Sequence, residues 1–149
     1  MSELRTRIVE DVKTAMRAGD YQRLGVLRML HAEIQQREVI EQVQITDAVV
    51  HAAVEKMVKQ RRDSETQFRA GNRADLADKE ASEILILMGY LPQQFSETEV
   101  SALIDQAIAE TGAAGGKDMG KVMGWIKPKA QGRTDMGKLS GLIKAKLGG

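Results

Sequence analysis

The sequence has no cysteine, two histidines and five aromatic residues among its 149 positions. Without cysteine there can be no disulfide and no thiolate zinc site, and the composition suits a reducing compartment. His31 and His51 lie outside any H-E-x-x-H pattern, so we expect no metal site from them. Because single-stranded bases bind by stacking on exposed rings, the shortage of aromatic residues argues against that mode of recognition.

A long apolar segment is also missing. The longest uninterrupted apolar run is Ile84–Met88, which is far too short to cross a bilayer. The first stretch, MSELRTRIVEDV, is charged from its third residue and has no apolar core of signal-peptide length. We therefore expect a cytoplasmic protein that has no membrane partner.

What remains is a strongly helical pattern. Residues that favour N-caps stand before segments with apolar residues at helical spacing. The apolar stripe is clearest after Thr46, where it consists of Val50, Ala53, Val54, Met57 and Val58. We expect helices from Ser2 to about Arg17, from Asp20 to about residue 42, from Thr46 to Gly71, and from about Asp75 to Tyr90.

The fourth segment ends at Leu91-Pro92, because a residue that precedes proline avoids helical geometry. The capping-box sequence Ser96-Glu97-Thr98-Glu99 then starts another amphipathic helix, which Gly112 terminates. We predict an all-α protein with a four-helix subdomain over residues 1–92 and a smaller three-helix subdomain over residues 93–149. Residues 92–95 are expected to form a hinge.

The C-terminal segment differs sharply in composition from the rest. Residues 112–149 carry eight basic and two acidic side chains, a net charge of +6, and ten of the fourteen glycines. Here DMGKVMGWIKPKAQG, from Asp118, is followed by DMGKLSGLIKAKLGG, from Asp135, and nine of the fifteen aligned residues are identical. Each copy begins with a helix-capping aspartate and ends with lysines, so each copy predicts one short helix.

Each copy also contains two glycines four residues apart, which places them on one helix face. A glycine inside a helix costs about 1 kcal/mol relative to alanine, so something must require an exposed backbone there. Either two helices pack closely through these glycines, or a phosphate backbone approaches them. We expect the glycine faces to pack against each other and the lysines to point outward as one basic surface, made of Lys121, Lys127, Lys129, Lys138, Lys144 and Lys146.

No arrangement of residues predicts catalysis. The GGKD sequence at 115–118 does not match a phosphate-binding loop. The motif requires a glycine at the position of Thr111 and a serine or threonine at the position of Asp118. One segment contains a cluster of acids, Asp75, Asp78, Glu80 and Glu83. Acidic side chains in the first turns of a helix usually stabilise it by interacting with the positive end of the helix dipole. We expect neither a cofactor nor a catalytic residue.

Another basic stretch, KQRRDSETQFRAGNR, runs from Lys59 to Arg73. Its cations alternate with acids, so the pattern fits both a phosphate-binding patch and ordinary pairing along a helix. The residues of interest here are Lys59, Arg61 and Arg62.

These landmarks, in their order and spacing, resemble the YqeY family over essentially the whole chain. They are LRML at 27–30, KQRRDS at 59–64, YLPQQFSETE at 90–99, DMGKVMG at 118–124 and GRTD at 132–135. That family is similar to the C-terminal helical and tail domains of GatB, the subunit of the tRNA-dependent amidotransferase. The resemblance implies two helical subdomains and contact with tRNA. It does not bring the kinase and transamidase chemistry of that carbon–nitrogen ligase.

We therefore expect a non-catalytic module that binds tRNA or tRNA-associated proteins. One alternative is an adaptor whose glycine faces dock protein helices, and another is an accessory component of a glutamine-dependent carbon–nitrogen ligase. The backbone would be approached at Gly120, Gly124, Gly137 and Gly141. The side chains expected at the nucleic acid are Lys117, Lys121, Lys127, Lys129, Arg133, Lys138, Lys144 and Lys146, together with Lys59, Arg61 and Arg62.

Overall fold

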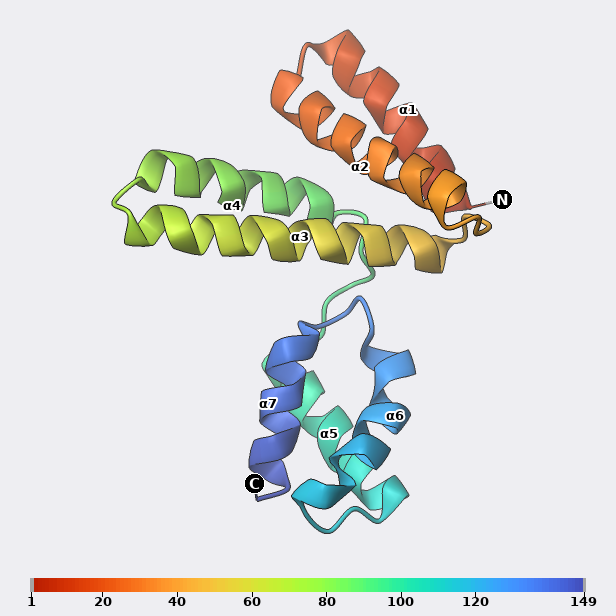
Figure 1. Ribbon diagram of the computed structural model, residues 1–149, viewed down its shortest axis with the longest axis vertical. Helices are drawn as coiled ribbons and strands as arrows, with labels where there is room; N and C mark the ends of the chain where they lie inside the picture. The colour runs from red at the N-terminus through yellow and green to blue at the C-terminus, as the bar shows by residue number, and fades with distance from the viewer. Residues whose placement is uncertain (1, 149) are drawn as a thin grey trace. The chain divides into compact units, whose positions relative to one another are not determined.

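The computed structural model describes residues 2–148, and every regular element within that range is a helix (Figure 1). The predicted all-α fold is confirmed. The elements are α1 (Glu3–Ala18), α2 (Tyr21–Ile40), α3 (Asp47–Ala70), α4 (Ala74–Met88), α5 (Glu97–Thr111), the 3-10 turn η1 (Gly116–Asp118), α6 (Met119–Ala130) and α7 (Met136–Lys146).

Contacts along the chain divide it into two compact units, Met1–Leu91 and Pro92–Gly149, which we call unit 1 and unit 2. Unit 1 contains α1 to α4, and unit 2 contains α5, η1, α6 and α7. The expected boundary between subdomains that fold on their own, at residues 92–93, stays a prediction about the chain in solution.

The first three helices of unit 1 begin at the side chains that the sequence predicts. Each capping oxygen accepts a hydrogen bond from the backbone N–H three residues later, which satisfies one of the unpaired amides of the first turn. The donors are Arg5 at 3.1 Å for Ser2, Arg23 at 3.2 Å for Asp20, and Val49 at 3.3 Å for Thr46. At the other end of α1, Gly19 has a φ of +69°, a left-handed conformation that glycine adopts without strain.

In unit 1, α1 pairs with α2 and α3 pairs with α4 (Figure 1). A single buried cluster with members from all four helices forms the core. The stripe predicted on α3 is the buried face of that helix. Full burial of one aliphatic side chain is worth about 1.5–3 kcal/mol, so this cluster supplies most of the driving force for folding. Its fully buried large members include Ile8, Leu27, Leu30, Ile34, Val50, Val54 and Leu87.

The segment that follows α4 is fixed to α1 by polar contacts. Tyr90 is only 2% exposed, and its hydroxyl donates a 2.5 Å hydrogen bond to Asp11 Oδ2. Burial and the adjacent carboxylate together raise the pKa of Tyr90 well above its ordinary value. Arg7 donates to the Gly89 carbonyl at 3.1 Å, and its guanidinium lies 4.7 Å from the centre of the Tyr90 ring. Unit 1 therefore holds its own C-terminal end in place.

Unit 2 begins its first helix with the predicted capping box, in which Ser96 and Glu99 each satisfy the other's backbone amide at 3.1 Å. Helix α5 then packs against both α6 and α7, and α6 packs against α7. The buried core of this unit consists of Val100, Ile104, Ala107, Val122, Ile126, Ala130, Leu139 and Ile143.

Candidate nucleic-acid interface

The two copies of the repeated phrase form α6 and α7, and both give the same positions to the core. Val122 and Ile126 of α6 are fully buried, as are Leu139 and Ile143 at the equivalent places in α7. Because each pair is four residues apart, each helix buries a single face made of branched aliphatic side chains. The repetition in sequence therefore corresponds to a repetition in packing.

The glycines do not form the contact between these helices, and the expectation that the glycine faces pack together is wrong. A Cβ built on Gly120, Gly124 or Gly141 would meet no atom within 4 Å. A Cβ on Gly137 would lie 3.3 Å from a carboxylate oxygen of Asp135, the N-cap residue of its own helix. All four glycines are exposed, because the aliphatic positions on another face of each helix already fill the core.

The two aspartates that open the repeats have different roles. Asp135 caps α7 as predicted, and its Oδ1 accepts hydrogen bonds from the amides of Gly137 at 2.8 Å and Lys138 at 3.3 Å. Asp118 makes no capping bond to α6, so that prediction is wrong. Its Oδ2 instead accepts from the Ala114 amide at 2.9 Å, because the loop before η1 folds back onto it. This backbone bond is the main reason why the pKa of Asp118 is lowered.

Each exposed glycine near the middle of a helix has a lysine three residues before it and another three residues after it. This spacing makes the three residues neighbours on the helix surface. We call the two sets, Lys121–Gly124–Lys127 and Lys138–Gly141–Lys144, the lysine–glycine strips. Lys121 is 68% exposed and lies 3.7 Å from Asp118, and the other three lysines are exposed. Within residues 2–148 the side-chain ammonium groups of Lys127, Lys138 and Lys144 make no hydrogen bond or ion pair.

The last lysine of each copy does not belong to such a strip, although Lys129 and Lys146 are both exposed. That six lysines form one outward surface stays a prediction. Lys129 lies over the ring of Trp125, with its ammonium 3.9 Å from the ring centre. Lys146 donates to Asp105 at 2.7 Å and to the hydroxyl of Ser101 at 2.8 Å. These two α5 residues could not be predicted from the sequence, because they precede Lys146 by more than forty positions and leave no local signal.

The other two basic residues of this region also have defined surroundings. Lys117 is exposed on η1, where its charge contributes to the lowered pKa of Asp118. Arg133 follows α6 and is half-buried, with its guanidinium 3.7 Å from the centre of the Phe95 ring. Neither residue lies on a lysine–glycine strip.

In unit 1, the three basic residues of interest on α3 lie in different environments. Lys59 and Arg62 are exposed. The side chain of Arg61 is only 12% exposed, and its Nη1 lies 3.2 Å from Glu80 and 2.8 Å from Glu83 on α4. These ion pairs join two helices of the core, so Arg61 is not available to a phosphate while they persist.

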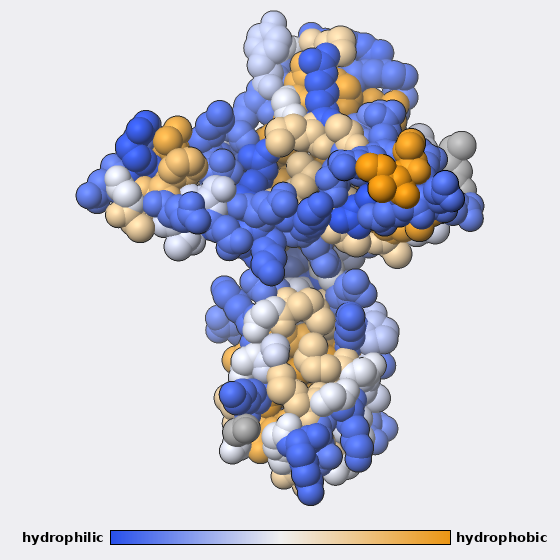
Figure 2. All heavy atoms as spheres, in the orientation of Figure 1, coloured by the Kyte–Doolittle hydropathy of each residue, from blue (hydrophilic) through white to orange (hydrophobic). Residues whose placement is uncertain are grey.

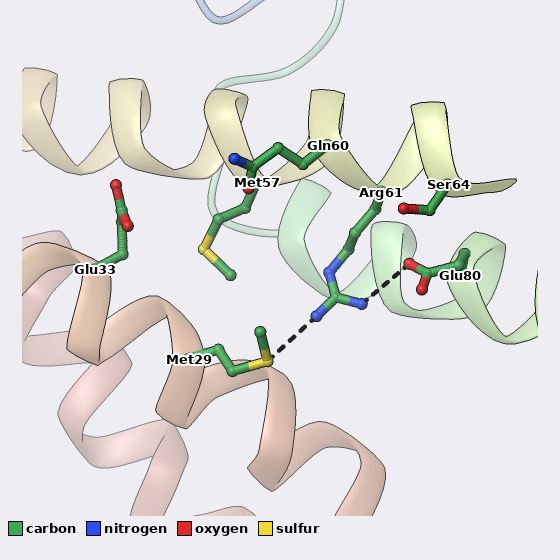
Figure 3. Close-up of a pocket in the computed structure, with 7 residues that line it drawn as sticks. All are labelled: Met29, Glu33, Met57, Gln60, Arg61, Ser64 and Glu80. Carbon is green, nitrogen blue, oxygen red and sulfur yellow. Dashed lines mark hydrogen bonds and ion pairs between the residues drawn. The ribbon is translucent and has the colours of Figure 1, made fainter. Parts of the chain in front are cut away.

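Arg61 also lines a pocket of about 280 Å³ between α2, α3 and α4 (Figure 3). Its Nη2 points across this pocket to the sulfur of Met29, 3.6 Å away. Glu33 contributes a carboxylate from α2 and is paired with Arg37 at 3.2 Å and Lys56 at 3.1 Å. Since the charged groups of the pocket already neutralise one another within the protein, we assign no ligand to it. Met57, Gln60, Ser64 and Glu80 complete its lining.

The acidic residues at the start of α4 pair with arginines as well. Asp75 lies 3.0 Å from Arg73, and Asp78 lies 3.2 Å from Arg69. Hydrophilic side chains cover most of the face of unit 1 in view, with separate hydrophobic spots between them (Figure 2). Like Arg61 with Glu80 and Glu83, these side chains neutralise one another between or along α3 and α4, in contrast to the lysine–glycine strips of unit 2.

None of the helices between residues 2 and 148 combines the length and apolar character needed to cross a membrane.

Sequence comparison shows what the chain is similar to. "Altered inheritance of mitochondria protein 41, mitochondrial" of Pyrenophora tritici-repentis is 30% identical over 129 residues, which cover 83% of this chain and 71% of that protein. Proteins of the same name from Lachancea thermotolerans and Kluyveromyces lactis are 36% and 33% identical, over 68% of this chain and 56% of their own lengths.

The chain thus spans little more than half of two of these relatives. Their name assigns those proteins to mitochondria, so a cytoplasmic location for this chain stays a prediction. The family described as Yqey-like protein matches residues 5–147. This match extends over both units and includes both lysine–glycine strips, and we conclude that the chain belongs to the YqeY-like family.

Proposed function

We propose that this protein binds tRNA through the lysine–glycine strips of unit 2 and does so without catalysing a reaction. One observation carries the proposal. In both copies of the repeat, an exposed glycine with open space around it stands between exposed lysines on the same helix surface. The arrangement occurs twice, at positions related by the same shift of seventeen residues.

Phosphate groups suit such a strip for two reasons. Lysine ammonium groups attract the phosphate backbone at long range, and neutralising it releases counterions. The missing Cβ of the glycine lets a bulky anionic chain come close to the helix backbone. Each glycine costs its helix about 1 kcal/mol relative to alanine, and no packing contact within the fold compensates for that cost. Close approach by a partner supplies a reason for keeping it.

The choice of tRNA among polyanions rests on the resemblance to the tail domain of GatB. The composition agrees with it, because five aromatic residues give little surface for stacking single-stranded bases. Recognition of a folded RNA by its shape and backbone needs cations rather than rings. No chemical step is part of the proposal, since the sequence offers no phosphate loop and no activated nucleophile.

The experiment is a salt titration of tRNA binding, followed by fluorescence anisotropy of a labelled transcript between about 50 and 200 mM salt. Lys121→Ala combined with Lys138→Ala removes one lysine from each strip. The double variant should bind more weakly, and the slope of log K against log salt should flatten by about one unit for each lost phosphate contact. Lys13→Ala with Lys79→Ala removes the same charge from unit 1 and is the matched control.

Absence of binding by the parent protein at low salt would overturn the proposal, as would equal weakening by the control pair. A protein adaptor is the second candidate, because open glycines can also admit a partner helix. Apolar docking of that kind would depend little on salt, whereas phosphate contacts depend on it steeply. Formation of Gln-tRNA by the pure chain with Glu-tRNA, glutamine and ATP would instead establish an enzyme.

A further inference from the structure

The chain leaves unit 1 through a segment that belongs, by its hydrogen bonds, to unit 2. The Phe95 amide donates to the carbonyl of Arg133 at 2.8 Å. Gln94 Nε2 donates to the carbonyl of Gly132 at 2.7 Å and to that of Pro92 at 3.0 Å. Residues 92–95 are thus tied to the turn that connects α6 with α7, roughly forty positions later in the sequence.

Arg133 is the central residue of this connection. Its Nε donates to the Gln93 carbonyl at 2.8 Å, and its guanidinium lies over the Phe95 ring at 3.7 Å. With its backbone carbonyl included, Arg133 holds the segment at the Gln93 carbonyl, the Phe95 amide and the Phe95 ring. Flat stacking combined with a directed N–H bond requires the planar guanidinium, which lysine lacks.

On the other side of the junction, unit 1 holds its end equally firmly. The Leu91 amide donates to the Met88 carbonyl at 3.1 Å, and the Leu91 side chain packs against the core of unit 1. Tyr90 is buried and bonded to Asp11. The proline ring fixes φ of Pro92, and the bond from Gln94 restrains its carbonyl. The contacts of unit 1 therefore reach Leu91 and those of unit 2 begin at Pro92, so the backbone between these two residues is the point that neither set of contacts holds.

We propose that Arg133 is a linker anchor, which fixes residues 92–95 to unit 2 and so confines rotation between the units to the Leu91–Pro92 junction. The pivot proposed here is narrower than the hinge at residues 92–95 that the sequence predicts. The anchor is independent of the proposed RNA binding, because its contacts lie within the protein. With the anchor released, a four-residue tether would replace a single pivot, and the range of orientations open to unit 2 would widen.

The anchor can be tested by chymotrypsin, which cleaves after Phe95 only when this segment opens. Arg133→Ala should speed the appearance of fragments 1–95 and 96–149 by about tenfold, since it removes a cation–π contact and a hydrogen bond. Lys129→Ala is the matched control, because it removes a lysine from the cation–π pair at Trp125 and leaves the linker untouched. Equal cleavage rates for the two variants would overturn the anchor.

Circular dichroism shows whether Arg133→Ala leaves unit 2 folded. If it does not, Gln94→Ala, which removes only the contacts to Gly132 and Pro92, takes its place and should still speed cleavage. The pivot itself is measured by the spread of distances between spin labels at Lys79→Cys and Glu110→Cys, which the absence of native cysteine makes specific. Release of the anchor should broaden that distribution, and an unchanged width would refute a confined pivot.

Discussion

Gly124 and Gly141 illustrate how the same residue type can have opposite meanings in a helix. A small side chain permits close packing of two backbones, or it leaves the backbone open to a partner, and sequence spacing is the same in both cases. The core positions decide between the two. Because Val122, Ile126, Leu139 and Ile143 fill the interior of unit 2, the glycines remain at its surface.

Because these glycines are exposed within helices, we expect unit 2 to be more stable with alanine at either position. Gly124→Ala and Gly141→Ala should each raise the free energy of unfolding of unit 2 by up to about 1 kcal/mol, through higher helix propensity and without any clash. Urea denaturation followed by circular dichroism and Trp125 fluorescence measures the change.

Gly112→Ala is the control for this pair. Its φ of +68° lies in the left-handed region, so alanine there should lower stability. A loss of stability in the Gly124 and Gly141 variants would mean that the glycines are packed after all.

At the scale of the element, the helices of this protein could be located from sequence because their signals are local. The caps at Ser2, Asp20, Thr46 and Ser96 each act on an amide three residues away. The stripe on α3 could likewise be predicted, since 3.6-residue periodicity alone defines it.

The candidate site was harder to predict, because its details depend on contacts between distant segments. Identical DMGK sequences suggested identical caps, yet the loop before Asp118 claims that carboxylate and leaves α6 without a side-chain cap. Lys146 resembled its neighbours in sequence and is held by α5 instead. Arg61 appeared in a basic run, but its partners come from α4.

The contact between Asp118 and the loop before η1 predicts a dependence on pH. The pKa of Asp118 is lowered in the folded state, so its contribution to stability is complete above the unfolded value of about 3.9 and is lost as pH falls through the folded value. Asp118→Asn keeps an acceptor for the Ala114 amide and removes the titrating group. Its melting temperature should therefore fall less than that of the parent between about pH 5 and pH 2.5.

The melting temperature of unit 2 is measured for the parent and for the Asp118→Asn variant at each pH, with Trp125 fluorescence as the probe. Parallel decline of the two melting temperatures on acidification would show that the Ala114 bond does not couple proton binding to folding.

At the scale of the whole molecule, the two buried clusters share no residue, and each lies entirely within one unit. Among residues 2–148, the cluster of unit 1 contains fourteen buried residues and that of unit 2 contains eight. A domain of about sixty residues buries a smaller fraction of its surface than a larger one and is correspondingly less stable. The two units should therefore unfold as separate cooperative transitions, with unit 2 melting first.

Expression of residues 1–91 and 92–149 as separate chains tests this division. The first piece retains every member of its core and the Tyr90–Asp11 bond, so it should melt cooperatively at the temperature of the upper transition of the full chain. The second piece retains its core, the linker anchor and both lysine–glycine strips. It should be helical and less stable than the first piece. It should also bind tRNA, with the same slope of log K against log salt as the full chain. If the 1–91 piece binds tRNA and the 92–149 piece does not, the interface lies in unit 1, at Lys59 and Arg62. If the 92–149 piece is unfolded, unit 2 needs unit 1 to fold.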